Sequence, residues 1–412
     1  MKSIKELYRI GTGPSSSHTM GPRKAAEMFV TRHPDAAKFK VTLYGSLAAT
    51  GKGHMTDVAI IDTLEPTAPV EIIWQPKVFL PFHPNGMTFA AFDTDDKLIE
   101  NWTVYSIGGG ALAENSDTPS IESRDVYGMN SMTEILEWCE RSGKGYWEYV
   151  KECEDSDIWD YLNEVWKTMI DSIRRGLEEE GVLPGPLNLR RKASTYYIRA
   201  TGYKQSLQSR GLVFAYALAV SEENASGGKI VTAPTCGSCG VMPAVLYHLY
   251  KSRDFSDIRI LRALATAGLV GNIVKFNASI SGAEVGCQGE VGVACAMASA
   301  AANQLFGGSP AQIEYAAEMG FEHNLGLTCD PVMGYVQIPC IERNAFVAQK
   351  AREAALYALF SDGRHMVSFD DVVKTMMETG RDMQAKYRET SLGGLAHVCL
   401  RELSHMPRKN KK

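Results

Sequence analysis

The chain has 412 residues, of which 45% are hydrophobic and 22% are charged, and its net charge is −5 at neutral pH. This length favours two domains, and the composition is that of a globular protein rather than a disordered or fibrous one. The mild negative charge excludes the basic surface that nucleic-acid binding requires, so we expect no nucleic-acid partner.

The sequence also predicts no targeting or membrane segment. The first residues, MKSIKELYRIGTG, lack the apolar stretch of a secretory signal, which predicts a cytoplasmic protein. The longest uncharged stretch, 291–313, contains amides, glycines and a proline. It therefore favours a buried helix followed by a turn over a membrane span.

The first part of the chain predicts a small α+β domain. Residues 19–32 repeat apolar side chains at helical spacing, and 41–47 alternate as a strand does. Residues 113–130 are polar and rich in turn formers, so we expect a linker there and a first domain over 1–130 with a small, mainly antiparallel sheet. Four further strands are expected, separated by Gly, Pro and Asp turns, at 58–61, 70–74, 87–93 and 102–107.

From Ser131 onward the apolar residues recur at helical spacing, as in 131–140 and 159–180. The later segments 260–274 and 290–306 are rich in Ala and Gly and contain few Lys and Glu residues. This composition is typical of buried helices that pack closely. The sequence therefore predicts one larger all-α domain over 131–412.

Nine cysteines are an odd number, which in a cytoplasmic chain favours thiols, metal ligands or nucleophiles over a disulfide framework. Three of them, Cys287, Cys329 and Cys340, stand in Gly- and Pro-marked segments where turns are expected. Three thiolates on a four-iron cluster would leave one iron open, and an open iron is a Lewis acid that can activate a hydroxyl group. Buried structural thiols are the competing interpretation, and spacing alone does not decide between the two.

A single C-x-x-C, formed by Cys236 and Cys239, could be redox-active or half of a zinc site. No second C-x-x-C completes a structural zinc site, so we assign neither cysteine a role.

Seven segments together carry a resemblance to a known family. In order along the chain they are GPSSSHTMGP, YGSLAATGKGHMTD, HPNGM, YSIGGG, TAPTCGSCGVMPAVL, SGAEVGCQGEVGVACAMA, and HNLGLTCDPV followed by QIPCIERNA. This pattern resembles the iron-sulfur L-serine dehydratases, in the form that joins a small α+β domain to the catalytic domain in one chain. The resemblance covers nearly the whole sequence.

The resemblance implies a 4Fe-4S cluster held by Cys287, Cys329 and Cys340, and elimination of water from L-serine to give pyruvate and ammonia. It also implies that three loop histidines of the first domain approach the cluster. A histidine near neutral pKa suits removal of the α-proton, and we expect His54 or His83 as the base with His18 positioning the substrate. A homodimer is expected from the family alone.

Further residues are candidates for substrate binding. Ser15, Ser16 and Ser17 precede a helical pattern, where hydroxyls could hold a carboxylate or simply cap the helix, and both alternatives stay open. His323 is close in sequence to Cys329, so we expect it to hydrogen-bond near the cluster. The substrate-binding candidates are Ser15, Ser17, Asn85, Thr235, Lys275 and Ser281.

Two departures from the family pattern stand out. The chain between IIDTLEP and HPNGM is shorter than in the family, so a peripheral loop or strand pair is expected to be missing. Some relatives end with a cysteine that occupies the open iron, whereas Cys399 here is followed by LRELSHMPRKNKK, so we expect Cys399 near the site at most.

Three other functions compete with this hypothesis. A related iron-sulfur lyase would act on L-cysteine and release sulfide. A pyridoxal phosphate lyase would need a Schiff-base lysine and a phosphate cradle, for which the Gly runs SIGGG and SGGK are weak candidates. The third is a metal-stabilised regulatory or binding protein, for which the single C-x-x-C offers little.

Overall fold

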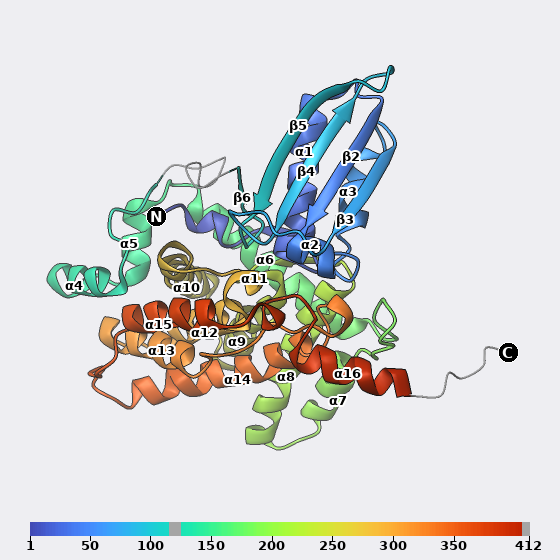
Figure 1. Cartoon of the computed structure of the whole chain (residues 1–412). Helices are drawn as coiled ribbons and strands as arrows, with labels where there is room; N and C mark the ends of the chain where they lie inside the picture. The colour runs from blue at the N-terminus through green and yellow to red at the C-terminus, as the bar shows by residue number, and fades with distance from the viewer. Residues whose placement is uncertain (115–124, 406–412) are drawn as a thin grey trace.

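The computed structural model of the chain describes residues 1–114 and 125–405. An upright sheet with helices on one face stands on a larger helical body (Figure 1). The predicted fold class, a small α+β part followed by a larger helical part, is confirmed. Residues 115–124 of the expected linker lie outside the described residues, and the boundary between domains 1–130 and 131–412 stays a prediction.

The small part is built on a five-stranded sheet of order β3-β2-β4-β5-β6. Only the β2–β3 pair is parallel, so the sheet is mainly antiparallel, as expected. Phe29 of α1 lies in its core against Phe39, Phe89 and Trp102. The elements are α1 Gly21–Arg32, β2 Lys38–Tyr44, α2 Gly45–Thr50, α3 Thr56–Leu64, β3 Val70–Gln75, β4 Gly86–Phe92, β5 Leu98–Ser106 and β6 Leu112–Ala113.

The strand expected at 58–61 is wrong, because these residues lie inside helix α3. The run VAII is too short to distinguish a strand from a helix. Over the longer segment, buried residues recur every three or four positions, as in a helix: Thr56, then Ala59 and Ile60, then Leu64. Val58, on the other side of the helix, is exposed. The strand expected at 41–47 ends at Tyr44, and its last three residues begin α2.

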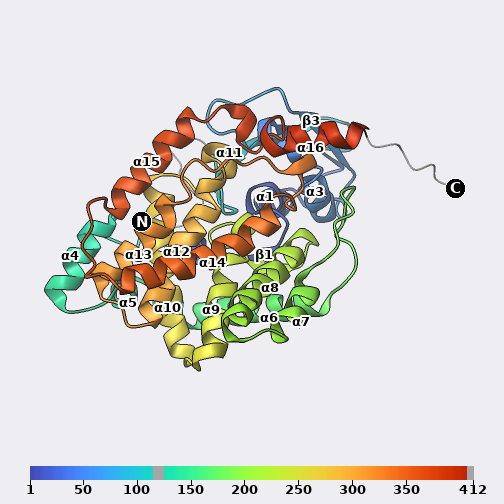
Figure 2. The same cartoon turned by 90° about the horizontal axis from the view of Figure 1, so that it is seen from below.

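The larger part is a helical bundle around α12 (Figure 2). Almost all residues of α12 are buried. Its Ala-rich sequence lets α9, α10, α13 and α14 pack directly against it. The helices are α4 Met132–Ser142, α5 Tyr146–Cys153, α6 Ile158–Glu178, α7 Ala193–Thr201, α8 Gln205–Ala225, α9 Val241–Arg253, α10 Asp257–Asn277, α11 Gly282–Val285, α12 Val291–Leu305, α13 Pro310–Glu322, α14 Cys340–Leu359, α15 Phe369–Asp382 and α16 Gly394–His405.

The N-terminal residues join the two parts. Met1, Ile4, Leu7 and Tyr8 are buried in the core of the helical part, and the Tyr8 hydroxyl donates to the Leu264 carbonyl at 2.9 Å. Strand β1 (Ile10–Thr12) then pairs antiparallel with β7 (Lys229–Val231), which is the one strand within 131–405 and departs from the all-α expectation. The chain enters the small part only after this anchor, which fixes the segment around His18 at the boundary.

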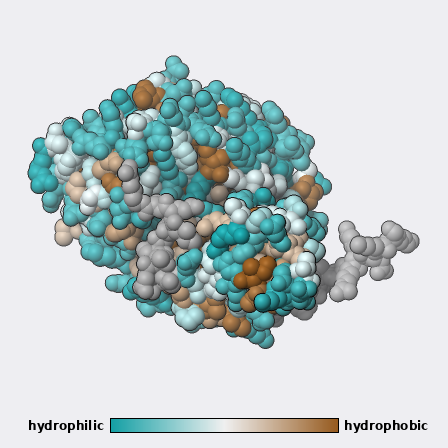
Figure 3. Space-filling model, turned by 90° about the horizontal axis from the view of Figure 1, so that it is seen from above, coloured by the Kyte–Doolittle hydropathy of each residue, from teal (hydrophilic) through white to brown (hydrophobic). Residues whose placement is uncertain are grey.

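None of the described helices combines the length and apolar character that crossing a bilayer requires. On the face that carries the sheet, apolar residues form small separate patches among polar ones (Figure 3).

Candidate active site

The three predicted cysteine ligands come from separate segments of the helical part. Cys287 lies in a short turn just before α12, and Cys340 is the first residue of α14. Cys329 lies in the loop after α13, where its amide donates to the Tyr387 carbonyl at 2.8 Å and its carbonyl accepts from the Glu389 amide at 2.7 Å. Two of the thiols are thus close to helix N-termini, whose partial positive charge favours a thiolate.

The three thiols lie close enough together for the charge of one to shift the pKa of another. Burial raises the pKa of Cys329 well above its usual value, and the charges of Glu290, Glu389 and the other two cysteines raise it further. Burial also raises the pKa of Cys340, followed by the effect of Cys287. The pKa of Cys287 rises to about 11 through burial, while the neighbouring Arg343 acts in the opposite direction.

Arg343 is the basic residue beside this group. It lies one turn after Cys340 on α14, donates to the Thr328 carbonyl at 2.6 Å and pairs with Asp330 at 3.5 Å. A guanidinium in this position offsets part of the negative charge that three thiolates would create. Arg343 stands in the segment QIPCIERNA, but the sequence reasoning assigned it no role.

Glu290 is a second residue that the sequence reasoning missed. Its carboxylate accepts a hydrogen bond from the Thr235 hydroxyl at 2.7 Å, and the Cys329 thiol lies 3.6 Å from its other oxygen. Burial raises the pKa of Glu290. Thr235, expected to bind substrate, therefore contacts Glu290.

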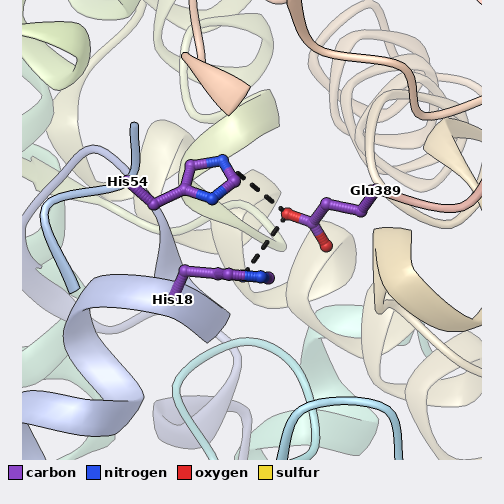
Figure 4. A group of neighbouring side chains, drawn as sticks. All are labelled: His18, His54 and Glu389. Atoms are coloured by element: carbon purple, nitrogen blue, oxygen red, sulfur yellow. Dashed lines mark ion pairs between the residues drawn. The ribbon is translucent and has the colours of Figure 1, made fainter. Parts of the chain in front are cut away.

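His18 and His54 form a buried pair at the boundary between the two parts. Their ring centroids are 4.5 Å apart, and both rings face the same carboxylate oxygen of Glu389, at 3.5 Å from His18 and 3.9 Å from His54 (Figure 4). Burial lowers the pKa of His18 to about 3 and lowers that of His54 well below its usual value, so both rings are neutral at pH 7. In donor type and spacing, this group of two histidines and one glutamate is compatible with a metal site.

The serines of the first loop hold His18. The Ser15 hydroxyl accepts from the His18 amide at 3.1 Å and caps the helical turn Ser16–Met20, while Ser17 bonds His18 Nδ1 at 2.9 Å. Ser46 bonds His18 Nε2 at 3.1 Å from the opposite side. Of the two alternatives for Ser15, helix capping is therefore the one seen in the structure.

His83, Asn85 and Ser281 each have a buried polar atom without a hydrogen-bond partner in the described parts of the chain: Nε2, Oδ1 and Oγ, respectively. The Asn85 backbone amide donates to His83 Nδ1 at 3.1 Å, so the neutral ring carries its hydrogen on Nε2, which lies 3.9 Å from a Glu284 carboxylate oxygen. His83 also lines a pocket of about 310 Å³, together with Ser46, Glu284, Arg388 and Thr390. Buried polar atoms are normally paired, so these three atoms indicate a place for a polar ligand.

Other candidates lie apart from this group. The Lys275 ammonium lies 3.3 Å from the backbone carbonyl of Glu6 and 3.8 Å from the side-chain carboxylate of Glu6. The expectation for His323 is wrong, because its ring is about half exposed and contacts Met319 and Glu322 on the surface. Cys399 lies in α16, whose first turn is tied to the residue after Cys329 by a 2.6 Å bond from the Leu395 amide to Asp330.

The donor set fits an iron-sulfur cluster. Thiolates are the ligands such clusters use, and Cys287, Cys329 and Cys340 are buried or partly buried within reach of one another's charge. Gly282 leaves space beside them, since a Cβ at this position would lie 3.1 Å from Cys329 Sγ.

The sequence matches known proteins along nearly the whole chain. Residues 3–75 match the family model of the serine dehydratase beta chain, and residues 85–396 match that of the serine dehydratase alpha chain. The chain belongs to the serine dehydratase family. The reaction of this family converts serine to pyruvate and ammonia.

Several bacterial members of the serine dehydratase family are similar over their full length. L-serine dehydratase 1 of Escherichia coli is 43% identical, with 96% of this chain and 99% of the relative aligned. The L-serine dehydratases of Streptomyces coelicolor and Haemophilus influenzae are each 42% identical, with 96% of this chain and 98% or 99% of the relative aligned. These alignments span 447 to 451 positions, more than the 412 residues present here, so the relatives contain insertions relative to this chain.

Proposed function

We propose that this chain is an L-serine ammonia-lyase that uses a 4Fe-4S cluster held by Cys287, Cys329 and Cys340. The observation that carries the proposal is the grouping of three thiols with a buried histidine pair and with buried polar atoms that lack partners. When bound, the cluster supplies a Lewis acid for the serine hydroxyl, which is otherwise a poor leaving group. Arg343 and the helix N-termini at Cys287 and Cys340 support the thiolate form of the ligands.

His54 is our candidate for the base that removes the α-proton of serine. Its Nδ1 atom donates to the Thr50 hydroxyl, which itself donates to the Ser46 carbonyl, so His54 Nε2 carries a lone pair. Burial lowers the pKa of His54 well below its usual value, so the ring is neutral and able to accept a proton at pH 7. His83 Nδ1 instead accepts from the Asn85 backbone amide, so His83 Nε2 carries a hydrogen and can donate to the substrate from the wall of the pocket. Loss of water then gives aminoacrylate, which hydrolyses to pyruvate and ammonia.

The remaining candidates would orient the substrate. Asn85 and Ser281 each offer a buried atom without a hydrogen-bond partner among the described residues, and Ser15, Ser17 and Thr235 act through their bonds to His18 and Glu290. The contacts of Lys275 with Glu6 support a structural role better than substrate binding. We also propose a cytoplasmic location and a homodimer, on the family resemblance.

Anaerobic purification provides the test. We expect iron and sulfide to co-purify with the chain and pyruvate to form from L-serine, and we expect both the colour and the activity to be lost in air. Cys287→Ala should lose iron, whereas Cys295→Ala, at a buried cysteine within α12, should keep it. A colourless protein with full zinc occupancy, an absorbance band of pyridoxal phosphate, or faster sulfide release from L-cysteine would each contradict the proposal.

A further inference from the structure

Glu389 is a buried carboxylate with one oxygen left over. Its Oε1 atom faces His18 and His54, whereas Oε2 has no hydrogen-bond partner within 1–114 and 125–405. Figure 4 shows both ring contacts reaching the same oxygen. The backbone of Glu389 has a φ of 55° and its amide donates to the Cys329 carbonyl, so the residue is held beside the cysteine loop.

Neither histidine offers a proton to Glu389. The Ser46 hydroxyl donates to the Glu389 carbonyl at 2.9 Å, so it accepts from His18 Nε2, and His18 Nδ1 accepts from the Ser17 hydroxyl at 2.9 Å. The Thr50 hydroxyl donates to the Ser46 carbonyl at 3.1 Å, so it accepts from His54 Nδ1, and His54 Nε2 carries no hydrogen. Among the described residues, the Ala283 backbone amide is the donor toward the Glu389 carboxylate, and it carries no charge.

The described residues supply no cation to the Glu389 carboxylate. No lysine or arginine there pairs with Glu389, and Arg343 is engaged by Asp330 and the Thr328 carbonyl. Glu290, the other carboxylate nearby, already has the Thr235 hydroxyl on one oxygen and the Cys329 thiol near the other. A buried carboxylate without a positive partner is unfavourable, so a ligand that supplies one would bind here.

We infer that Glu389 binds the α-ammonium group of the amino-acid substrate. An ammonium group has N–H donors and one positive charge, which match a buried carboxylate that no lysine or arginine of the described residues pairs. This inference rests on the proposed function and extends it, because it names the group that selects amino acids over hydroxy acids. It also brings the α-carbon of the substrate toward His54 Nε2, which lies 3.9 Å from Glu389 and is free to act as the base.

Two ligands that cannot give pyruvate separate the contributions. L-Alanine keeps the ammonium and carboxylate of serine, and 3-hydroxypropionate keeps the carboxylate and hydroxyl but has no ammonium. Their dissociation constants are measured by calorimetry on anaerobic holoenzyme whose iron content is known. Glu389→Gln should weaken L-alanine binding by about 10- to 100-fold, because the ammonium group of L-alanine loses a charged hydrogen bond. It should change 3-hydroxypropionate binding little, because this ligand has no ammonium group. Glu389→Asp, which keeps the charge, should restore part of the loss.

Glu314→Gln is the matched control, since Glu314 is also a buried, histidine-paired carboxylate, 2.9 Å from His365, but lies in α13 outside the site. It should leave both constants unchanged. If Glu389→Gln bound L-alanine as the wild type does and lost only turnover, Glu389 would be a base and the inference would be wrong. Equal weakening of both ligands, or loss of a bound divalent metal, would also overturn it. A wild-type enzyme without iron or turnover would instead contradict the proposed function itself.

Discussion

Gly282→Ala tests whether the space around the cysteines is needed. A Cβ at this position would lie 2.5 Å from Glu290 Oε1 and 3.1 Å from Cys329 Sγ, both closer than ordinary contact. Glu290 cannot move away easily, because the Thr235 hydroxyl holds its other oxygen at 2.7 Å. Gly237 lies against that same oxygen, where a Cβ would come within 2.7 Å. The carboxylate of Glu290 therefore fits between two glycines.

Overpacking of this kind lowers the free energy of unfolding by about 1–3 kcal/mol. Because the atoms that must shift include a proposed ligand, we also expect Gly282→Ala to contain less iron and sulfide per chain. The assay is metal and sulfide analysis of anaerobic protein, alongside urea unfolding. Gly128→Ala is the control, since a Cβ there meets nothing within 4 Å. A Gly282→Ala protein with wild-type iron content and wild-type unfolding free energy would refute the reasoning.

Three further predictions concern the base, the small core and pH. His54→Gln should lower kcat by about 10²- to 10⁴-fold without loss of iron, whereas His248→Gln, at a buried histidine bonded to Ser209, should not; unchanged kcat would exclude His54 as the base. Phe29→Ala should lower the unfolding free energy by about 3–5 kcal/mol in urea titration, because Phe29 is fully buried among aromatic rings. Burial raises the pKa of Glu314 from 4.5 to about 7, so the folded state holds this proton more tightly and stability falls as pH rises from about 4.5 to 7. Glu314→Gln should reduce that fall by up to about 3 kcal/mol, measured by unfolding at pH 5 and pH 8.

The sequence by itself determined the fold class and the family. Helical periodicity from Ser131 onward and strand alternation in 70–107 depend on residues close together in the chain, and so they can be recognised without coordinates. The motifs around Cys287, Cys329 and Cys340 were also recognisable, because each is a short continuous segment with a Cys beside Gly or Pro. The helix at 58–61 shows the limit of this approach, since a four-residue apolar run fits either structure.

Only the tertiary structure decided which groups meet. Glu389 follows His18 by more than 300 residues, and no motif marks it, yet its carboxylate contacts both His18 and His54. Glu290 and Arg343 likewise gain their significance from neighbours on other helices. The physical reason is that burial and charge pairing depend on which residues folding brings together. Whether a carboxylate is buried without a positive partner can therefore be known only from the folded structure.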